Sequence, residues 1–587
     1  MKRISVIFAV LILILTFGCN PNQENPPMLP TTASIVPLND VTHSVSALAG
    51  TDALGREIRP ATEKKDKLVG LFYFLWLGNY YYEGQQMFDE IYDISKTDLA
   101  KIFASNGGTP FSRMHFWGEP LFGYYNMRDR WVVERHIRMF IAAGIDFLAF
   151  DTTNNDYYPK VLDVVLEVLL DYQSQGYDVP KIMFLTNTDS GVRVQEIYDY
   201  VYAKDDYRSL WFTDEDEGRN PERKPWITIN KSHLVYLSKD AYDCFYFKDS
   251  QWPNNPYLED GFPWIEFTRP QPVHNGIVSV SVAQNAGMHM SSSVQYKVSP
   301  NSYDYYNSNW GRGYTTYGKN DSAKIAEGAN FQEQWDNAIA LDPHIIFVTG
   351  WNEWAALKLH TKVTGIGDST VFFDCFDIEF SRDIEPMRDG YGDNFYMQLI
   401  MNVRRFKGVE NSGISFDRKT VAQWSDWNEV TSGVSEPLNG ARDFVDAALK
   451  GTYTSPEPVN DIVEVRAAAD DKNLYFLVTA ADDLKGMQDD EFMKLWLKTA
   501  AGADYNYAIS GKDGSIVSAA KGDVGKATVN RSGKFVWYTI SKELVDYTDA
   551  FGVQVKVAYH VAIEANIMDA YTTGDVAPYG RLNYQFR

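Results

Sequence analysis

Acidic side chains flanked by aromatic residues stand directly after several short apolar runs of the sequence. Asp151 ends one such run, Asp189 follows another, and Glu353 lies in the segment 351–354 (WNEW). Two carboxyl groups can cleave a glycosidic bond when one protonates the leaving oxygen and the other acts as base or nucleophile. Because two tryptophans would partly desolvate Glu353 and raise its pKa, we expect it to be the general acid. The alternative is that the tryptophans close the fold and Glu353 caps a loop.

Aromatic, amide and charged side chains near the same positions could bind a sugar. Rings hold the C–H faces of sugars, and amides bind their hydroxyls. The candidate substrate-binding residues are Tyr73, Trp76, His115, Trp117, Asn187, Asn230, Lys248, Gln284, Trp351, Asn352, Trp354, Asp377, Glu379 and Arg382. The last three lie in the acidic segment 373–386, where Arg382 could pair with one acid and hold the others in place. The alternative for this segment is an ion-pair loop that braces one domain against the next.

Eight short apolar runs alternate with helical stretches and must position these residues. The runs are 68–76, 111–117, 145–151, 181–186, 226–230, 244–248, 277–283 and 344–349. Such runs are typical of parallel strands buried on both faces. They predict an α/β fold, a (β/α)8 TIM barrel, whose sites gather at the C-terminal ends of the strands. An open, doubly wound sheet is the alternative.

The helices between these runs have clear signals of their own. Residues 129–144 place Val133, Ile137 and Phe140 on one helical face. The stretch ends at Gly144, a residue type favoured just after a helix. We therefore expect a helix here that packs its apolar face on the barrel.

The ordered set of motifs in this region resembles a known family. Residues 129–151, Trp335 and the WNEW segment 351–354 resemble the glycoside hydrolase family 71/99-like proteins, and 381–386 (SRDIEP) resembles a lipoprotein subgroup. The resemblance implies a (β/α)8 barrel that cleaves α-linked glycans. The endo-α-mannosidase branch carries its catalytic glutamates after strand four, whereas residues 185–191 here contain none. Its catalytic residues are therefore not transferred, and Asp189, Asp151, Glu353 or the acids of 374–385 remain the candidates.

Beyond about residue 410 the pattern changes to alternating strands separated by turns. Residues 474–479, 494–498, 505–509, 534–540 and 553–561 alternate like half-buried strands and predict an antiparallel β-sandwich. Residues 460–462 and 471–477 resemble the early strands of family 9-like carbohydrate-binding modules, some of which bind calcium. The module's large rings and acidic loop residues are Trp427, Trp496, Trp537, Asp482, Asp483 and Asp489. The alternative for the three tryptophans is a place in the core.

The N-terminus has the organisation of an export signal. Lys2 and Arg3 precede the apolar stretch 4–17, and Gly18-Cys19 resembles a bacterial lipobox. The resemblance implies lipidation of Cys19 and a protein anchored by lipid to a bacterial membrane. The expected parts are a signal peptide (1–18), a flexible tether (19–66), the barrel (67–410) and a β-sandwich resembling a carbohydrate-binding module (411–587). The alternative for part of the tether is that it packs on the domain that follows. An ordinary secretory peptide is the alternative for the first part.

The amino-acid composition of the chain bears on which classes of partner it could bind. The formal net charge of −23 argues against nucleic acid, because phosphate binding needs a basic face. Aromatic residues make up 14% of the chain, which suits sugar stacking but also suits large cores. Cys244 and Cys375 are either a disulfide or two separate thiols. The scattered histidines and the absence of an HExxH motif predict no catalytic metal.

Three functions compete on this basis. The first is a glycoside hydrolase that acts on a polysaccharide or host glycan by carboxylate chemistry. The second is a glycan-binding surface lipoprotein without catalysis, suggested by the missing glutamates after strand four. The third is a structural or adhesion lipoprotein, because a fold does not fix a function. Carbohydrate is the expected partner in the first two, and the membrane is contacted only through the lipid anchor.

Overall fold

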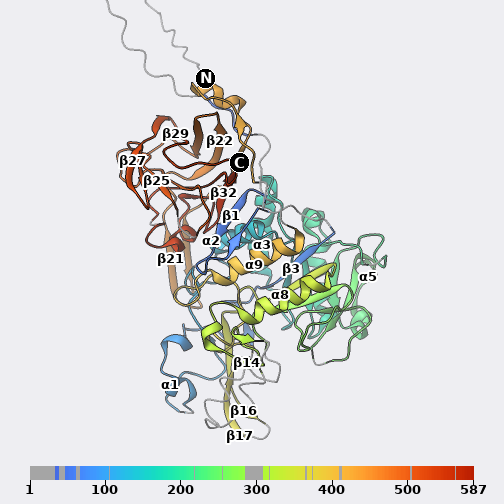
Figure 1. Ribbon diagram of the computed structural model, residues 1–587. Helices are drawn as coiled ribbons and strands as arrows, with labels where there is room; N and C mark the ends of the chain where they lie inside the picture. The colour runs from blue at the N-terminus through green and yellow to red at the C-terminus, as the bar shows by residue number, and fades with distance from the viewer. Residues whose placement is uncertain are drawn as a thin grey trace, which may run out of the picture.

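The structure, a computed structural model, consists of a barrel and a sandwich packed against each other (Figure 1). It describes residues 34–38, 46–60, 66–82, 84–104, 106–216, 218–253, 255–284, 309–315, 318–363, 367–372, 374–408, 413–502, 505–561 and 563–587. The signal peptide predicted for residues 1–18 and the lipidation predicted at Cys19 lie outside these ranges. Among the helices described, none combines the length and the apolar character that crossing a bilayer requires.

Eight parallel strands form the predicted barrel. They are β3 (Leu68–Phe74), β7 (Phe147–Thr152), β8 (Lys181–Thr186), β9 (Trp226–Ile229), β10 (Tyr246–Gln251), β11 (Gly261–Pro263), β12 (Ile277–Ser281) and β15 (Ile345–Thr349). They hydrogen-bond in the order β11-β10-β9-β8-β7-β3-β15-β12. At the seam between β11 and β12, Ser279 Oγ donates a hydrogen bond of 2.8 Å to the Pro263 carbonyl. The prediction of a TIM barrel is confirmed.

One predicted barrel strand is wrong, and one real strand is absent from the prediction. The run 111–117 contributes β6 (Met114–Phe116), which pairs antiparallel with β16 (Ala355–Val363) outside the barrel. β3 pairs directly with β7, so no edge remains for β6 between them. β11 takes the missing place, and it is only three residues long, between a glycine and a proline. Consequently 181–186 is the third barrel strand and β9 is the fourth.

Helices surround the barrel as the sequence predicts. They are α2 (Arg130–Ala143), α3 (Pro159–Ser174), α4 (Ser190–Ile197), α5 (Lys239–Cys244), α8 (Ala329–Leu341) and α9 (Asn394–Lys407), whereas the short α1 (Leu99–Phe103) lies apart from the barrel (Figure 1). α2 buries Val133, Ile137 and Phe140, as its periodicity predicts. Gly144 ends it with φ of 75°, and its N–H bonds to the Ile141 carbonyl at 3.1 Å. A left-handed residue at this point favours glycine.

Two antiparallel sheets form the predicted sandwich. One contains β1 (Leu48–Thr51), β2 (Glu57–Ile58), β24 (Lys494–Lys498), β25 (Tyr507–Ile509), β26 (Ser515–Ser518), β27 (Gly522–Lys526), β30 (Val553–Ala558), β31 (Val576–Ala577) and β32 (Asn583–Phe586). The other contains β18 (Asp417–Arg418), β19 (Gly433–Ser435), β22 (Ile462–Ala469), β23 (Asn473–Ala480), β28 (Thr528–Ser532) and β29 (Phe535–Ser541). Alternate residues of facing strands, such as Leu474, Phe476 and Leu495, share one core.

The large rings and acidic loops of the sandwich have structural partners. Trp427, Trp496 and Trp537 are 0%, 1% and 6% exposed, so these rings belong to cores and present no open stacking face. Asp489 pairs with His560 Nε2 at 2.6 Å. Within the described ranges, no three His, Cys, Asp or Glu side chains come together as a metal site would require.

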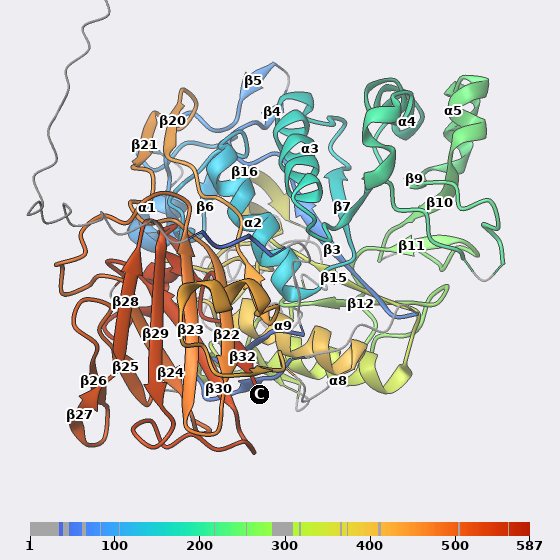
Figure 2. The same cartoon turned by 90° about the horizontal axis from the view of Figure 1, so that it is seen from above.

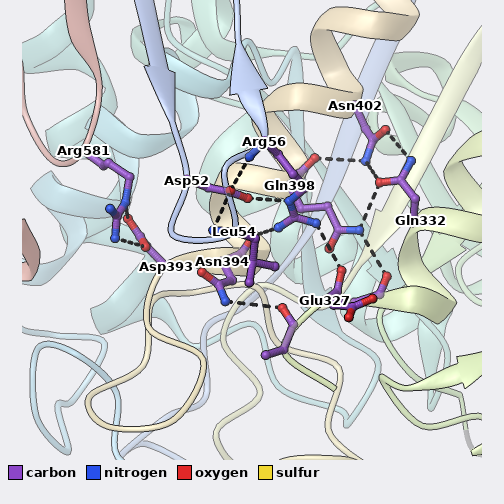
Figure 3. A network of polar contacts seen from close by, with 12 residues as sticks. Asp52, Leu54, Arg56, Glu327, Gln332, Asp393, Asn394, Gln398, Asn402 and Arg581 are labelled. Atoms are coloured by element: carbon purple, nitrogen blue, oxygen red, sulfur yellow. Dashed lines mark hydrogen bonds and ion pairs between the residues drawn. The ribbon is translucent and has the colours of Figure 1, made fainter. Parts of the chain in front are cut away.

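Residues 46–60, within the range predicted as a tether, pack on the globular part of the protein. β1 pairs with β32 of the sandwich, and β2 pairs with β1. Arg56 donates to the carbonyls of Glu327 and Asn394, both at 3.1 Å, which joins the β1–β2 hairpin to α8 and α9 (Figure 3). The free edge of β32 and these helix-terminal carbonyls supply partners for the hairpin, so this stretch is ordered.

Polar contacts fix the sandwich against the barrel. The hairpin of β20 (Arg442–Asp446) and β21 (Gly451–Ser455) lies away from the sandwich sheets (Figure 2). Arg442 Nε contacts Asp129 Oδ2 at 2.7 Å at the start of α2. Arg581 Nε contacts Asp393 Oδ2 at 2.7 Å just before α9 (Figure 3). Charged pairs with little exposure therefore set the position of the two domains relative to each other.

Candidate active site

A pocket opens at the C-terminal ends of the barrel strands. Its volume is about 310 Å³. Its walls are Phe72, Phe74, Trp76, Tyr80, Met114, Asp151, Thr153, Asn154, Trp252, Trp264, Glu353, Ala355, Ala356, Leu357, Asp374 and Arg382. The residues come from β3, β6, β7 and β16, from the loops after β3, β7, β10, β11 and β15, and from the segment 374–382 that follows β17 (Gly367–Phe372). Polar groups thus converge on an otherwise aromatic and apolar cavity, which is the usual character of a ligand site.

Asp151 lies near the end of β7 and is 4% exposed. Its Oδ1 accepts hydrogen bonds from the Thr153 backbone N–H at 3.1 Å and from Thr153 Oγ1 at 2.7 Å. Burial raises the pKa of Asp151, and the charge of Asp374 adds to the rise, whereas the Thr153 bonds oppose it. The two Thr153 bonds favour the ionised form of this carboxyl.

Glu353 faces the same pocket from the loop after β15 and is 5% exposed. Its Oε2 accepts from Arg382 Nε at 3.0 Å and from Arg382 Nη2 at 2.5 Å. Burial raises the pKa of Glu353 well above its usual value, Arg382 opposes the rise, and Asp374 adds to it. Burial disfavours the charge of Arg382, but Glu353 and Asp374 outweigh this effect and raise the pKa of the guanidinium. Arg382 therefore stays cationic.

The backbone of Glu353 is held separately from its side chain. Its N–H donates to Asp383, and its carbonyl accepts from Trp117 Nε1 at 3.1 Å. Trp117 Nε1 also contacts Asp383 Oδ2 at 2.9 Å, and the ring stacks on Trp354 with centroids 4.5 Å apart. Burial raises the pKa of Asp383 to about 7. Trp117 and Trp354 therefore support the loop that carries Glu353, instead of lining the pocket.

Asp374 is a third carboxyl at the pocket, and the sequence named it only as one of the candidate acids of 374–385. Its side chain is 49% exposed, and its Oδ1 lies 3.4 Å from Arg382 Nη2. It has a φ of 65°, a conformation that L residues seldom adopt. It lines the same cavity as Asp151 and Glu353, and its charge adds to the rise in the pKa of both. The only signal in the sequence was its membership of the acidic segment 373–386.

Aromatic rings from three different loops line the pocket. Trp76 and Tyr80 follow β3, with ring centroids 6.2 Å apart. Trp252 follows β10, Trp264 follows β11, and their centroids are 5.3 Å apart. Asn187, a predicted binding residue, accepts from Trp252 Nε1 at 2.7 Å and so orients that ring. Trp264 was not predicted, because the β11 segment carries almost no strand signal, and Trp252 was not predicted, because β10 continues to Gln251, beyond the predicted run 244–248.

The structure divides the predicted site residues into those that line the pocket and those that do not. The ones that line it are Trp76, Asp151, Glu353 and Arg382. Asn352 lies directly beneath it, where its side chain pairs with both the N–H and the carbonyl of Phe74 at 3.0 and 3.1 Å. Asn352 therefore fixes the end of β3 beside the loop that carries Glu353.

Several predicted residues point away from the pocket because strand side chains alternate between faces. Tyr73 lies between Phe72 and Phe74, and its hydroxyl is 2.9 Å from His136 Nδ1 on α2. Trp351 packs against Phe140 of α2, with centroids 4.7 Å apart. Lys248 Nζ pairs with Asp216 Oδ2 at 2.8 Å. These three side chains stabilise the outer layer of the barrel, so their predicted binding role is corrected.

Other predicted residues have local structural roles. Asp189 is exposed, has a φ of 48° and precedes α4, and it does not line the pocket. Asn230 accepts from the Ser232 N–H at 3.1 Å and caps a short helix (Lys231–Tyr236). His115 stacks on Tyr92, and Gln284 hydrogen-bonds to Gln334 and Asn330. Asp377 accepts hydrogen bonds from the N–H groups of Glu379 and Phe380. The carbonyl of Glu379 accepts a hydrogen bond from the Arg312 N–H.

Cys244 and Cys375 do not form a disulfide. Cys375 is buried behind Glu353, with its Sγ 3.5 Å from the Glu353 carbonyl, and Cys244 is half-buried at the end of α5. Burial raises the pKa of both thiols. Neither lines the pocket, so thiol nucleophilic chemistry has no support at this site.

Comparison with known proteins yields only distant structural likeness. No family model matches the chain, and no curated protein matches it. A GH99 endo-alpha-mannosidase from Bacteroides thetaiotaomicron is 16% identical with a TM-score of 0.33, covering 59% of this chain and 98% of its own. A glycoside hydrolase-like protein is 13% identical with a TM-score of 0.26, covering 59% and 96%. These values are too low to transfer residue roles or activity to this chain.

Proposed function

We propose that this protein is a glycoside hydrolase whose active site is the pocket at the mouth of the barrel. One observation carries the proposal: two buried carboxyl groups, Asp151 and Glu353, come from different strand ends and line one cavity walled by tryptophans. Paired carboxyls and aromatic walls are what cleavage of a glycosidic bond requires. The sequence resemblance to family 71/99-like hydrolases makes α-linked glycans the first substrates to test.

The surroundings of the two carboxyls support different roles. Glu353 is assigned as the proton donor, because burial raises its pKa well above its usual value; the proton would sit on Oε1, since Oε2 accepts both bonds from Arg382. Asp151 is assigned as the base or nucleophile, because two bonds from Thr153 oppose the rise in its pKa that burial causes, whereas the pKa of Glu353 is raised well above its usual value. Arg382 holds the Glu353 carboxyl by one oxygen and limits its rotation, so the proton would be delivered from a fixed position.

A reducing-end assay on α-mannan, α-glucan, pectin and host glycans tests this proposal. We expect Glu353→Gln to lower kcat roughly 100- to 10,000-fold, the usual range for loss of a general acid. Asp189→Asn is the matched control, since Asp189 is acidic, follows a barrel strand and lies off the pocket. Substrates with a nitrophenyl leaving group should partly restore turnover in Glu353→Gln, because they need little protonation. An equal loss of kcat in Glu353→Gln and Asp189→Asn, or full activity in Glu353→Gln, contradicts the assignment of Glu353 as the proton donor.

The Arg382–Glu353 ion pair also favours a second function, glycan binding without catalysis. A carboxylate locked by an arginine can serve as a rigid hydrogen-bond acceptor for a sugar hydroxyl. In that case a glycan would raise the melting temperature of the protein, and neither the wild type nor Glu353→Gln would form product. Any new reducing end that depends on Glu353 would exclude this alternative.

We also propose that the protein is exported and anchored by lipid at Cys19. The support is the order of charged, apolar and small residues in 1–19. The protein should partition into the detergent phase when expressed in bacteria, and Cys19→Ala should remove it from that phase. Partition that survives the substitution would contradict the anchor.

A further inference from the structure

A small hairpin extends the aromatic wall of the pocket outward. β4 (Tyr81–Tyr82) and β5 (Gln85–Gln86) follow β3 and pair antiparallel, with Tyr82 opposite Gln85 and Tyr81 opposite Gln86. The ladder continues one step inward, because the Met87 N–H donates to the Tyr80 carbonyl at 2.9 Å. Figure 2 shows the hairpin at the rim of the barrel, beside α3.

The two faces of this hairpin differ. Side chains alternate along a strand, and directly opposed residues share a face. Tyr80, Tyr82 and Gln85 are therefore on one face, and Tyr81 and Gln86 are on the other. Gln86 has a structural role, since its side chain donates a hydrogen bond to the Gly78 carbonyl at 3.1 Å and accepts one from the Phe88 N–H at 3.2 Å.

The Tyr82 face is continuous with the pocket. Tyr80 lines the cavity beside Trp76. Tyr80 shares this cavity with Asp151 and Asp374; burial raises the pKa of Tyr80, and Tyr82, Asp151 and Asp374 add to the rise. Tyr82 is 55% exposed, and Gln85 is exposed as well. Residues two apart on a strand are separated by roughly 6.7 Å, so the exposed ring continues the wall by one step.

We infer that the Tyr82 ring and the Gln85 amide form a platform that binds the glycan chain where it leaves the pocket. The ring offers a face for the C–H groups of a sugar, and the amide offers both a donor and an acceptor for hydroxyls. The inference rests on the proposed function, because its occupant is the chain that enters the pocket. The substrate is then an oligosaccharide or polymer that extends beyond the cavity.

Substitution on the two faces of the hairpin tests the platform. Tyr81→Ala is the matched control for Tyr82→Ala, since Tyr81 is 58% exposed on the same strand but faces the other way. On the polymer that the wild type cuts, Tyr82→Ala should raise KM about 5- to 10-fold with kcat unchanged, and Gln85→Ala should raise it about threefold. Tyr81→Ala should have no effect. A nitrophenyl monosaccharide, which fills only the pocket, should be cut equally by all variants.

Two results would overturn the platform. One is an equal KM increase in Tyr81→Ala and Tyr82→Ala, and the other is an equal loss on the short and the long substrate. If the wild type cuts no glycan, the proposed function fails, and affinity electrophoresis in the same polymers decides the platform separately. Retardation that is lost in Tyr82→Ala and kept in Tyr81→Ala supports it. Equal retardation of both variants, or none of the wild type, overturns it.

Discussion

Tryptophans at the barrel mouth and tryptophans in the sandwich differ in what surrounds them. Trp76, Trp252 and Trp264 stand beyond the ends of strands and line a cavity. Trp496 and Trp537 stand within strands β24 and β29, on the faces that point away from the sandwich core, where residues such as Ile563 and Trp427 cover them. A ring beyond the end of a parallel strand lies among loops, whereas a ring within a strand of a sheet is covered by a packed layer of residues. Abundant tryptophan therefore predicts sugar binding only after the position of each ring on its element is known.

Two buried arginine–glutamate pairs provide the largest contrast between the domains. Arg382 contacts Glu353 in the barrel, and Arg466 contacts Glu464 at 2.7 Å in the sandwich. Removing one partner of a buried ion pair costs about 3–5 kcal/mol, so Arg382→Met and Arg466→Met should both lower the free energy of unfolding by that amount. Only Arg382→Met should also lower kcat, by about 100-fold, because Glu353 would lose its fixed position. Urea unfolding and turnover of the folded fraction measure the two effects.

Arginine variants that behave alike in both assays would contradict this contrast. A loss of turnover in Arg466→Met at a temperature where it is fully folded would mean that the sandwich contributes to the reaction. Unchanged turnover in Arg382→Met would mean that the backbone bonds from Asp383 and Trp117 position Glu353 without help from the guanidinium.

Truncation of one tryptophan in each domain should separate function from stability. Trp264→Ala should lower kcat/KM about 10-fold, because the ring borders the pocket and lies 5.4 Å from the Arg382 guanidinium. Trp537→Ala should cost about 3–5 kcal/mol of stability, because it leaves a cavity in a packed core, and should leave kcat/KM of the folded protein unchanged. Steady-state kinetics and thermal unfolding distinguish the outcomes. Sugar binding lost in Trp537→Ala would restore a binding role for the sandwich.

A smaller effect concerns the pH dependence of stability. Burial raises the pKa of Asp575 in the sandwich from 3.8 to about 6. The folded state therefore holds this proton more tightly than the unfolded state, and the contribution to stability is lost as pH rises from 3.8 through about 6. Asp575→Asn should flatten the fall in unfolding free energy over this window and leave the pH profile of activity unchanged. Urea titrations at several pH values test it, and an identical slope in the variant would contradict it.

The sequence predicted the parts of the site that depend on strand order. Asp151 and Glu353 lie more than 200 positions apart. They meet because β7 and β15 both end at the same rim. The face of each side chain was harder to predict. Tyr73 was chosen although its neighbours Phe72 and Phe74 line the pocket, since the side-chain period of two gives no absolute direction. Asp374 depends on a left-handed backbone within a loop, which no periodic pattern signals.

The proton donor and the aromatic rings of the pocket lie on different segments, and this affects how the sequence can diverge. The machinery around Glu353 is braced within one stretch, from Asn352 to Asp383, with Trp117 as support. The surrounding rings, in contrast, sit on separate loops after β3, β10 and β11. Insertions or substitutions in any one of those loops can reshape the cavity without disturbing the proton donor. Descendants of such a scaffold would be expected to exchange one sugar for another while inheriting the same chemistry.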